Sequence, residues 1–256
     1  MASPVALVTG AAGGIGDAIV RALALQGIPV AAVDARADLL ELLVKDLTAN
    51  GHPVRGYPVD VRSTAEVEAA VDRVEEELGP IHYLVNAAGV LRVGPAASFS
   101  DDDWDLTLAV NTTGVFHVSR AVSARMIPRR RGAIVTVASN AARTARWNMA
   151  AYAASKAAAT AFTKNLGLEL AQYGIRCNVV APGSTDTPML TSLWAGDDAL
   201  RTSIEGTPDT FRVGIPLGRL ARPADVAHAV LFLLSDRAAH ITLHDLTVDG
   251  GAALGH

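Results

Sequence analysis

Seven short apolar runs recur along the chain, and segments of helical character lie between them. The runs are rich in β-branched residues, end in Gly, Asp, Asn or Ser, and occupy residues 5–10, 28–35, 54–61, 83–89, 133–139, 175–183 and 246–251. Strands buried on both faces of a sheet have this composition, and alternating strands and helices imply parallel pairing with right-handed crossovers. The sequence therefore predicts an α/β fold, a doubly wound, seven-stranded parallel sheet flanked by helices.

The length and composition fit one domain of this kind. The chain has 256 residues, half of them hydrophobic, and we find no repeat or linker in it, so residues 1–256 are expected to form a single domain. No apolar run approaches the roughly 20 residues that span a bilayer. The N-terminus MASPVALVTG lacks the basic region of a signal peptide. These features predict a cytoplasmic protein without a membrane partner.

Charge and cysteine content argue against two further kinds of partner. The net charge is −4, and the one compact basic run, Arg129–Arg131, is interpreted as a solvated helix end that complements the helix dipole. We therefore expect no nucleic-acid partner. Cys177 is the only cysteine, which excludes a disulfide within the chain, and its apolar surroundings predict a small buried hydrophobe. The histidines show no metal-ligand spacing, and no metal site is expected.

Several helix ends are marked by side chains that satisfy free backbone groups. Ser63 with Glu66 has the pattern of a capping box, and Ser100 precedes three aspartates at the start of another helix. Pro223 suits the first turn of a later helix. Residues 184–215 show no clean period, and segments of this length inside a compact domain usually carry function. We interpret residues 184–215 as a substrate lid.

A glycine-rich turn, GAAGGIG at residues 10–16, joins the first apolar run to the helical segment that follows. Gly10 is expected to make the turn, Gly14 to allow close approach of a pyrophosphate, and Gly16 to let helix and strand pack closely. The N-terminus of the helix, which includes Ile15, offers free N–H groups and a positive dipole to phosphates. This context predicts a dinucleotide site in a Rossmann fold.

Asp34 ends the second apolar run, twenty residues after Gly14. A carboxylate at this position can hydrogen-bond both ribose hydroxyls and repels a 2′-phosphate. Arg36 favours the opposite choice, because an arginine can accommodate that phosphate. The glycine turn contains no basic residue and Asp34 holds the closer position, so we predict NAD rather than NADP as the cofactor.

Further motifs follow other apolar runs. Asn86-Ala-Ala-Gly89 follows the fourth run, Asp60 the third, and Pro182-Gly183 ends the sixth. With the T-G-x-x-x-G-x-G spacing of the first turn, they resemble the short-chain dehydrogenase/reductase family over essentially the whole chain. The cofactor residues that the resemblance implies, beyond the glycine turn and Asp34, are Asp60, Val61, Asn86, Ala88, Gly89, Tyr152, Lys156, Pro182, Gly183, Thr185 and Thr187.

Asn111, Ser139, Tyr152 and Lys156 match the catalytic tetrad of that family in order and spacing. Tyr152 and Lys156 share one helix face at i and i+4. A free tyrosine has a pKa of about 10, and a nearby ammonium together with an oxidised nicotinamide lowers it. The resemblance implies that Tyr152 is the general base in alcohol oxidation and the general acid in ketone reduction. It also implies that Lys156 binds ribose, Ser139 contacts the substrate oxygen, and Asn111 holds a water.

More particular strings, among them SNAARTARWNMAAYAASKAA and HITLHDLTVDGGAALG, resemble family members that oxidise a ring hydroxyl of a carboxylated cyclohexadiene diol. Such a small-molecule substrate needs a cation for its carboxylate and apolar walls for its ring. Arg92 and Arg146 lie on loops expected at the carboxyl ends of strands, and either can form a bidentate pair with a carboxylate; Arg143 is a third candidate. Besides Ser139, the candidate residues around the ring are Trp147, Met149, Met189 and Leu190.

Two other functions remain open from the sequence. One is an NADPH-dependent reductase of a 3-oxoacyl thioester or small ketone, against which Asp34 argues. The other is a dinucleotide-sensing regulator without catalysis, which would not need the complete tetrad. The family commonly assembles through the helix that carries Tyr152 and through the C-terminal region. Residues 223–256 are apolar enough for such contacts, so we expect a homotetramer.

Overall fold

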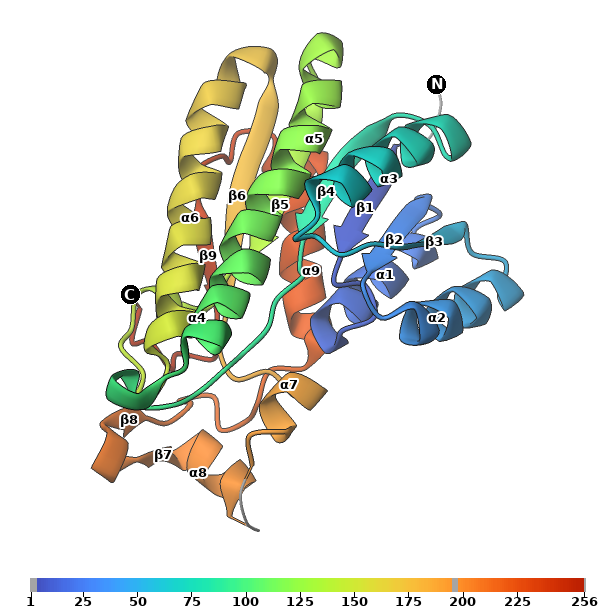
Figure 1. The fold of residues 1–256 in the computed structure, drawn as a ribbon. Coiled ribbons are helices and arrows are strands. Elements are labelled where there is room, and N and C mark those ends of the chain that lie inside the picture. Colours follow the sequence, from blue (N-terminus) through green and yellow to red (C-terminus); the bar gives the residue numbers. More distant parts are fainter. Residues whose placement is uncertain (1–3, 195–197, 256) are drawn as a thin grey trace.

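A parallel sheet of seven strands forms the middle layer of the protein (Figure 1) in a computed structural model that describes residues 4–194 and 198–255. The strand order is β3-β2-β1-β4-β5-β6-β9. The strands are β1 (Val5–Thr9), β2 (Val30–Asp34), β3 (Val54–Pro58), β4 (Ile81–Asn86), β5 (Gly132–Val137), β6 (Ile175–Pro182) and β9 (Asp245–Val248). All six neighbouring pairs are parallel, which confirms the predicted doubly wound α/β class.

Helices cover both faces of this sheet (Figure 1). One face carries α1 (Gly14–Leu25), α2 (Ala37–Ala49) and α9 (Pro223–Leu234), and the other carries α3 (Thr64–Glu77), α5 (Gly114–Arg129) and α6 (Ala150–Leu170). Successive residues of a strand point to opposite faces, so Leu7 and Val8 enter different cores, and both are buried. Each such side chain contributes about 1.5–3 kcal/mol when fully buried. Cys177 lies in the second core, as expected, and burial raises the pKa of its thiol to about 12.

The position of β1 determines where a ligand can bind. β1 pairs with β2 on one side and with β4 on the other, so the crossovers leave it in opposite directions. In open α/β sheets, ligands bind beyond the carboxyl ends of the strands at such a switch point. In Figure 1 these ends face the lower part of the molecule, where α7 (Pro188–Thr191) and α8 (Ala199–Glu205) lie.

Helix starts follow the sequence expectations, with one difference. The Ser100 hydroxyl accepts from the backbone N–H of Asp103, and the Ser63 hydroxyl accepts from Glu66 N at 3.3 Å. The Glu66 carboxylate does not return this bond to Ser63. It accepts instead from the backbone N–H of Asp60 at 3.0 Å. The predicted capping box is therefore wrong in its second half, because the backbone N–H of Ser63 already donates to the backbone oxygen of Asp60 at 3.0 Å.

The basic run at the end of α5 also differs from expectation. The helix ends at Arg129, as expected, and Arg130 adopts a left-handed conformation with φ of 52°. The Arg129 guanidinium forms an ion pair with Glu75 of α3 at 2.6 Å and donates to the backbone oxygen of Ile81. Arg129 thus joins α5 to α3 and β4 rather than forming part of a solvated turn.

The segment proposed as a lid contains short elements beneath the carboxyl ends of the strands (Figure 1). They are α7, α8 and a two-stranded antiparallel ribbon of β7 (Gly206–Thr207) and β8 (Arg212–Val213). Residues 195–197 of the proposed lid lie outside the described residues. Its function as a lid stays a prediction. No helix in the described part of the chain has both the length and the apolar character to cross a membrane.

Candidate active site

Three of the four glycines of the first turn lie where a side chain would collide with other atoms. Gly10 has a φ of 64°, and a Cβ on it would lie 2.7 Å from the backbone oxygen of Ala87. A Cβ on Gly16 would collide with the backbone oxygen of Gly10. A Cβ on Gly14 would lie 2.6 Å from Cγ2 of Thr187. The turn therefore keeps bare backbone at the N-terminus of α1, the arrangement that admits a dinucleotide pyrophosphate.

Asp34 is held at the end of β2 by three groups of the protein. Its carboxylate accepts from the backbone N–H of Ala12 and of Arg36, both at 3.0 Å, and from the Arg36 guanidinium at 3.1 Å. The residue is only 7% exposed. A fixed carboxylate beside the glycine turn fits the ribose hydroxyls of a dinucleotide, and the Arg36 charge is turned toward Asp34.

Thr9, which the sequence analysis did not single out, shapes the loop after β4. Its hydroxyl accepts from the backbone N–H groups of Ala87 and Ala88 at 3.1 and 3.2 Å. The Asn86 side chain is 2% exposed and donates to the Ser119 hydroxyl at 2.9 Å, so it is directed into the protein. The backbone of this loop, rather than the Asn86 side chain, faces the carboxyl edge of the sheet.

The loop after β3 also borders the expected cofactor site. Asp60 forms an ion pair with Arg62 at 2.6 Å, and this contact holds the pKa of the Asp60 carboxyl below its usual range. Val61, next to it, is buried against Gly114. Because Asp60 and Val61 follow β3 and the glycine turn follows β1, all of these groups lie at the same edge of the sheet.

The loop after β6 packs closely against the end of β9. A Cβ on Gly183 would lie 2.6 Å from Cβ of Asp249, so only glycine fits here beside Pro182. Thr185 is 5% exposed, and the Thr187 hydroxyl accepts from the backbone N–H of Leu190 at the start of α7. The loop thereby brings Thr187 against the glycine turn from the opposite side.

Tyr152 and Lys156 lie on α6 and reach the carboxyl edge beside Ser139. The Lys156 ammonium donates to the backbone oxygen of Val137 at 2.9 Å and lies 5.8 Å from the centre of the Tyr152 ring. Burial lowers the pKa of Lys156 to about 8. Burial raises the pKa of Tyr152, and the hydrogen bond with Ser139 opposes this rise. Within the protein alone the pKa of Tyr152 is therefore raised, which is the direction opposite to the one that the predicted general base needs.

Asn111 lies in a five-residue π-helical turn, Ala109–Thr113, between α4 (Asp101–Leu108) and α5. Its amide nitrogen donates to the backbone oxygen of Val90 and to the Ser155 hydroxyl, and its amide oxygen accepts from Val90 N at 2.8 Å. The side chain is fully buried. Asn111 therefore ties the loop after β4 to α6, directly behind Lys156. Single π-helical turns are frequent at functional sites.

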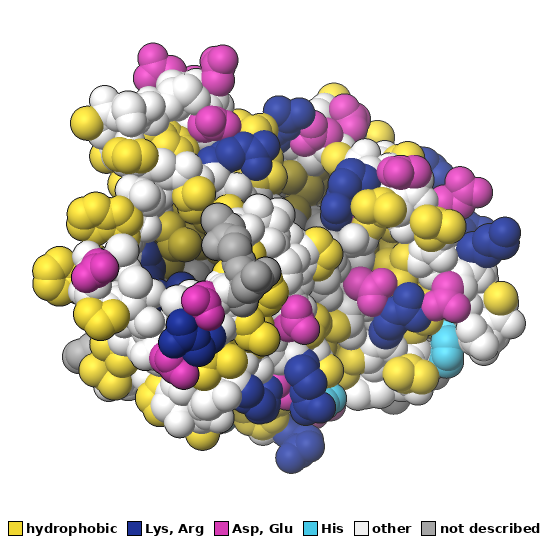
Figure 2. Space-filling view, turned by 90° about the horizontal axis from the view of Figure 1, so that it is seen from below, with side chains coloured by type: hydrophobic (Ala, Val, Ile, Leu, Met, Phe, Trp, Pro, Cys, Tyr) yellow, Lys and Arg dark blue, Asp and Glu magenta, His cyan; other side chains and the backbone are white. Residues whose placement is uncertain are grey.

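A cavity of about 730 Å³ extends from Tyr152 and Ser139 toward residues 184–215. Figure 2 looks onto this edge of the molecule, where mainly hydrophobic side chains surround a hollow. Large apolar residues line much of the cavity, and six of them are Leu91, Trp147, Met149, Met189, Leu190 and Trp194. Four of them were expected from the sequence; Leu91 and Trp194 were not. The cavity can hold a small ring beside Tyr152 and Ser139, which also line it.

The three candidate arginines lie in different environments. Arg146 lines the cavity and is half-buried. Arg92 does not line it, because its guanidinium forms an ion pair at 3.1 Å with Asp103, near the start of α4. Arg143 pairs with Asp245, a buried carboxylate of β9. Of the three, only Arg146 is brought together with Tyr152 and Ser139.

Comparisons with known proteins agree with this geometry. Residues 4–198 match the family model described as short chain dehydrogenase. The chain belongs to the short-chain dehydrogenase family. A 2,3-dihydro-2,3-dihydroxybenzoate dehydrogenase of Bacillus subtilis (strain 168) is 55% identical over 251 residues, covering 98% of this chain and 96% of the relative. The enzyme of that name in Escherichia coli (strain K12) is 45% identical over 248 residues, covering 97% and 96%.

A solved structure extends the comparison to the fold. A gluconate 5-dehydrogenase from Burkholderia cenocepacia J2315, in complex with NADP and tartrate, superposes with a TM-score of 0.88 at 33% identity, covering 99% of this chain and 96% of that one. The dehydrogenase thus uses a nicotinamide dinucleotide, and its bare glycine turn and fixed Asp34 fit such a cofactor.

Arg212 of the dehydrogenase is a second guanidinium in the cavity, and the sequence analysis did not identify it. It lies in β8 and donates to the Ser184 hydroxyl at 2.7 Å. Its only signal in the sequence is a charge between two apolar residues, Phe211 and Val213, in a segment without a regular period. The long sequence separation from Ser139 concealed its position.

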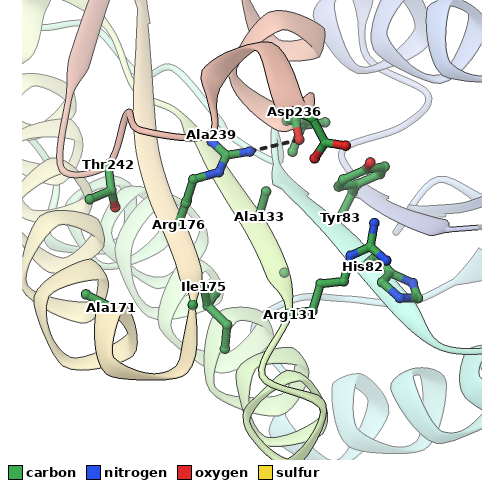
Figure 3. A pocket seen from close by; sticks show the side chains of 13 residues that line it. His82, Tyr83, Arg131, Ala133, Ala171, Ile175, Arg176, Asp236, Ala239 and Thr242 are labelled. Atoms are coloured by element: carbon green, nitrogen blue, oxygen red, sulfur yellow. Dashed lines mark hydrogen bonds between the residues drawn. The ribbon is translucent and has the colours of Figure 1, made fainter.

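A second cavity, of about 340 Å³, lies at the opposite, amino-terminal ends of β4, β5 and β6. Figure 3 shows Arg176 extending from β6 toward the segment that holds Asp236, with Tyr83 on the other side. The Arg176 guanidinium donates to the backbone oxygens of Leu233 and Leu234 at 2.6 and 2.9 Å. Arg176 therefore caps the C-terminus of α9, and we assign this cavity no part in catalysis.

Proposed function

We propose that the dehydrogenase uses NAD to oxidise a ring hydroxyl of 2,3-dihydro-2,3-dihydroxybenzoate, giving the catechol acid 2,3-dihydroxybenzoate for siderophores or related products. One observation supports this substrate assignment. A single cavity is lined by Tyr152, Ser139 and Arg146 together with apolar side chains. A carboxylated ring needs both a cation and apolar surface. Two relatives named 2,3-dihydro-2,3-dihydroxybenzoate dehydrogenase, 55% and 45% identical to this chain, support the proposal.

The residues of the cavity divide the chemistry among them. A bound nicotinamide cofactor would supply the acceptor for the hydride that leaves the carbinol carbon. Tyr152 takes the proton of the hydroxyl group as its C–O bond becomes a carbonyl, and Ser139 hydrogen-bonds the same oxygen. Lys156 provides a buried positive charge that favours the tyrosinate. The resulting ketone loses a ring proton to solvent and gains a hydroxyl proton, and aromatisation makes the oxidation effectively irreversible.

Asp34 supports NAD as the cofactor. Its carboxylate is fixed by Ala12 and by the backbone of Arg36, so it cannot move away from a 2′-phosphate without breaking these bonds. The alternative is a reductase of a 3-oxoacyl thioester or small ketone that uses NADPH, for which Arg36 would have to leave Asp34.

The proposal is tested by following NADH formation with purified protein and 2,3-dihydro-2,3-dihydroxybenzoate. We expect faster turnover than with simple cyclic alcohols, a preference for NAD over NADP, and at least a 100-fold loss in Tyr152→Phe. Near wild-type turnover in Tyr152→Phe would remove the assigned base. A preference for NADPH and acyl-carrier substrates would favour the reductase, and binding of NAD without turnover of any alcohol would favour a regulator.

We also propose a cytoplasmic homotetramer that assembles through α6 and residues 223–256. Leu168 of α6 and Phe232 of α9 are apolar side chains at the surface, 68% and 37% exposed, which suits burial between subunits. Light scattering after size-exclusion chromatography measures the assembly, and a monomer would contradict it.

A further inference from the structure

Arg212 is positioned by the loop that ends β6. Its guanidinium donates to the Ser184 hydroxyl at 2.7 Å. The backbone oxygen of Ser184 accepts in turn from the backbone N–H of Ala221. The short ribbon of β7 and β8 supplies the backbone of Arg212. Arg212 therefore has a defined place in the cavity lining that also contains Arg146 and Tyr152.

The two guanidiniums leave an excess of positive charge in a largely apolar cavity. Burial lowers the pKa of both Arg146 and Arg212, and the charge of Arg146 lowers that of Arg212 further. Among residues 4–194 and 198–255, no ion pair joins either guanidinium to a carboxylate. Asp249 attracts Arg146, but its carboxylate already accepts from Asn140 and from the backbone N–H of Ala253. Like charges held together at low polarity are costly unless an anion joins them.

The lining also contains a donor without an acceptor. The indole N–H of Trp194 is buried and has no hydrogen-bond partner in the described part of the chain. The cavity lining thus carries two guanidiniums and a free N–H, whereas its described carboxylate, Asp198, already accepts from Arg201. A ligand group that accepts several hydrogen bonds and carries negative charge complements this lining.

We propose that Arg212 and Arg146 bind the substrate carboxylate together, so that Arg212 sets the preference of the enzyme for a carboxylated ring. The inference rests on the proposed function and adds the second cation to it. A carboxylate has about four lone-pair sites and can accept from two guanidiniums at once. With its carboxylate held there, the ring lies between the apolar walls and its hydroxyl groups face Tyr152 and Ser139.

The test compares two substrates in four proteins: wild type, Arg212→Met, Arg146→Met and Arg219→Met. Arg219 is the control, because it is an arginine paired with Asp225 and neither residue lines the cavity. The substrates are 2,3-dihydro-2,3-dihydroxybenzoate and the same cyclohexadiene diol without the carboxylate. Loss of a charged hydrogen-bond partner should raise KM for the carboxylated diol about 10- to 100-fold in Arg212→Met, with kcat changed far less.

With the uncharged diol the same variant should lose far less than with the carboxylated one, so that its preference for the carboxylated diol falls about 10- to 100-fold, and Arg219→Met should keep the wild-type preference. Calorimetric titration with benzoate gives a second readout that needs no turnover: Arg212→Met should bind it at least tenfold more weakly. An unchanged KM and unchanged benzoate affinity in Arg212→Met would overturn the proposal that Arg212 helps Arg146 to bind the carboxylate, while leaving the proposed function intact. Failure of wild type to oxidise the carboxylated diol, with benzoate binding still dependent on Arg212, would reject that substrate but not the anion site.

Discussion

Replacing Lys156 by methionine should make the protein more stable at neutral pH while abolishing its activity. Lys156 is 5% exposed, and burial lowers its pKa from 10.5 to about 8. At pH 7 the native protein therefore holds a charged ammonium in a site that disfavours the charge. Methionine has nearly the same length, fills the same space and carries no charge, so the variant is relieved of this cost.

The size of the effect follows from the shift. A change of roughly 2.5 pKa units corresponds to about 3 kcal/mol of cost to the native state below pH 8. The variant also loses the hydrogen bond from the ammonium to the Val137 oxygen, worth about 1 kcal/mol. We therefore expect Lys156→Met to be more stable than wild type by roughly 2 kcal/mol at pH 7.

The pH dependence distinguishes this explanation from better packing. A depressed pKa means that the unfolded chain binds more protons than the native state between pH 8 and 10.5. Wild type should therefore gain stability relative to the variant across that interval, by up to about 1.4 kcal/mol per pH unit, and the advantage of the variant should disappear about 1.5 pH units above pH 8 and reverse beyond that.

Urea unfolding of both proteins at equal concentration from pH 7 to 10 measures the difference. Lys164→Met, which removes a more exposed lysine from the same helix, is the control and should change stability by no more than about 0.5 kcal/mol. A difference between wild type and Lys156→Met that stays constant with pH would refute the reasoning. A variant less stable than wild type at pH 7 would do the same.

Three further predictions concern other parts of the fold. Gly16→Ala should cost about 1–3 kcal/mol and weaken NADH binding, because its Cβ would collide with the backbone oxygen of Gly10; thermal unfolding and NADH fluorescence titration measure both. Asp34→Ser should lower the ratio of kcat/KM with NAD to that with NADP about 10- to 100-fold, and an unchanged ratio would exclude Asp34 as the selector. Asp225→Asn should destabilise the protein by about 1 kcal/mol at neutral pH, because the Asp225 carboxylate accepts from the backbone N–H of Arg222. The pKa of Asp225 is held far below its usual range, so the difference in stability should vanish as the pH falls well below 4.

The parallel sheet was predictable because its signal is local. All five residues of β1 are buried, so a strand covered on both faces appears as an uninterrupted apolar run. The same holds for Tyr152 and Lys156, whose spacing on one helix places them together whatever the rest of the chain does. The prediction of the end of β3 was less accurate. The apolar run extends to residue 61, but the strand stops at Pro58, before the loop in which Asp60 pairs with Arg62.

The choice among the arginines was not predictable, because it depends on distant carboxylates. Asp103 holds Arg92 at the surface, and Asp245 holds Arg143 although the two are about a hundred positions apart in the chain. Arg146 and Arg212 remain for the cavity because no described carboxylate forms an ion pair with them. Such partners are determined by the packing of β9 and α4, about which the loop sequences carry no information.

The π-helical turn that holds Asn111 makes the active site sensitive to the exact number of residues in one helix. From Asp101 to Arg129 the chain runs as α4, the turn and α5 without a loop that could absorb a change in length. Deleting one residue within Ala109–Thr113 would let regular α-helical bonding continue, and would rotate one part of the helix against the other by about 100°. Single-residue insertions and deletions should therefore be far less tolerated here than in the loop at residues 50–53, where the chain has room to adjust.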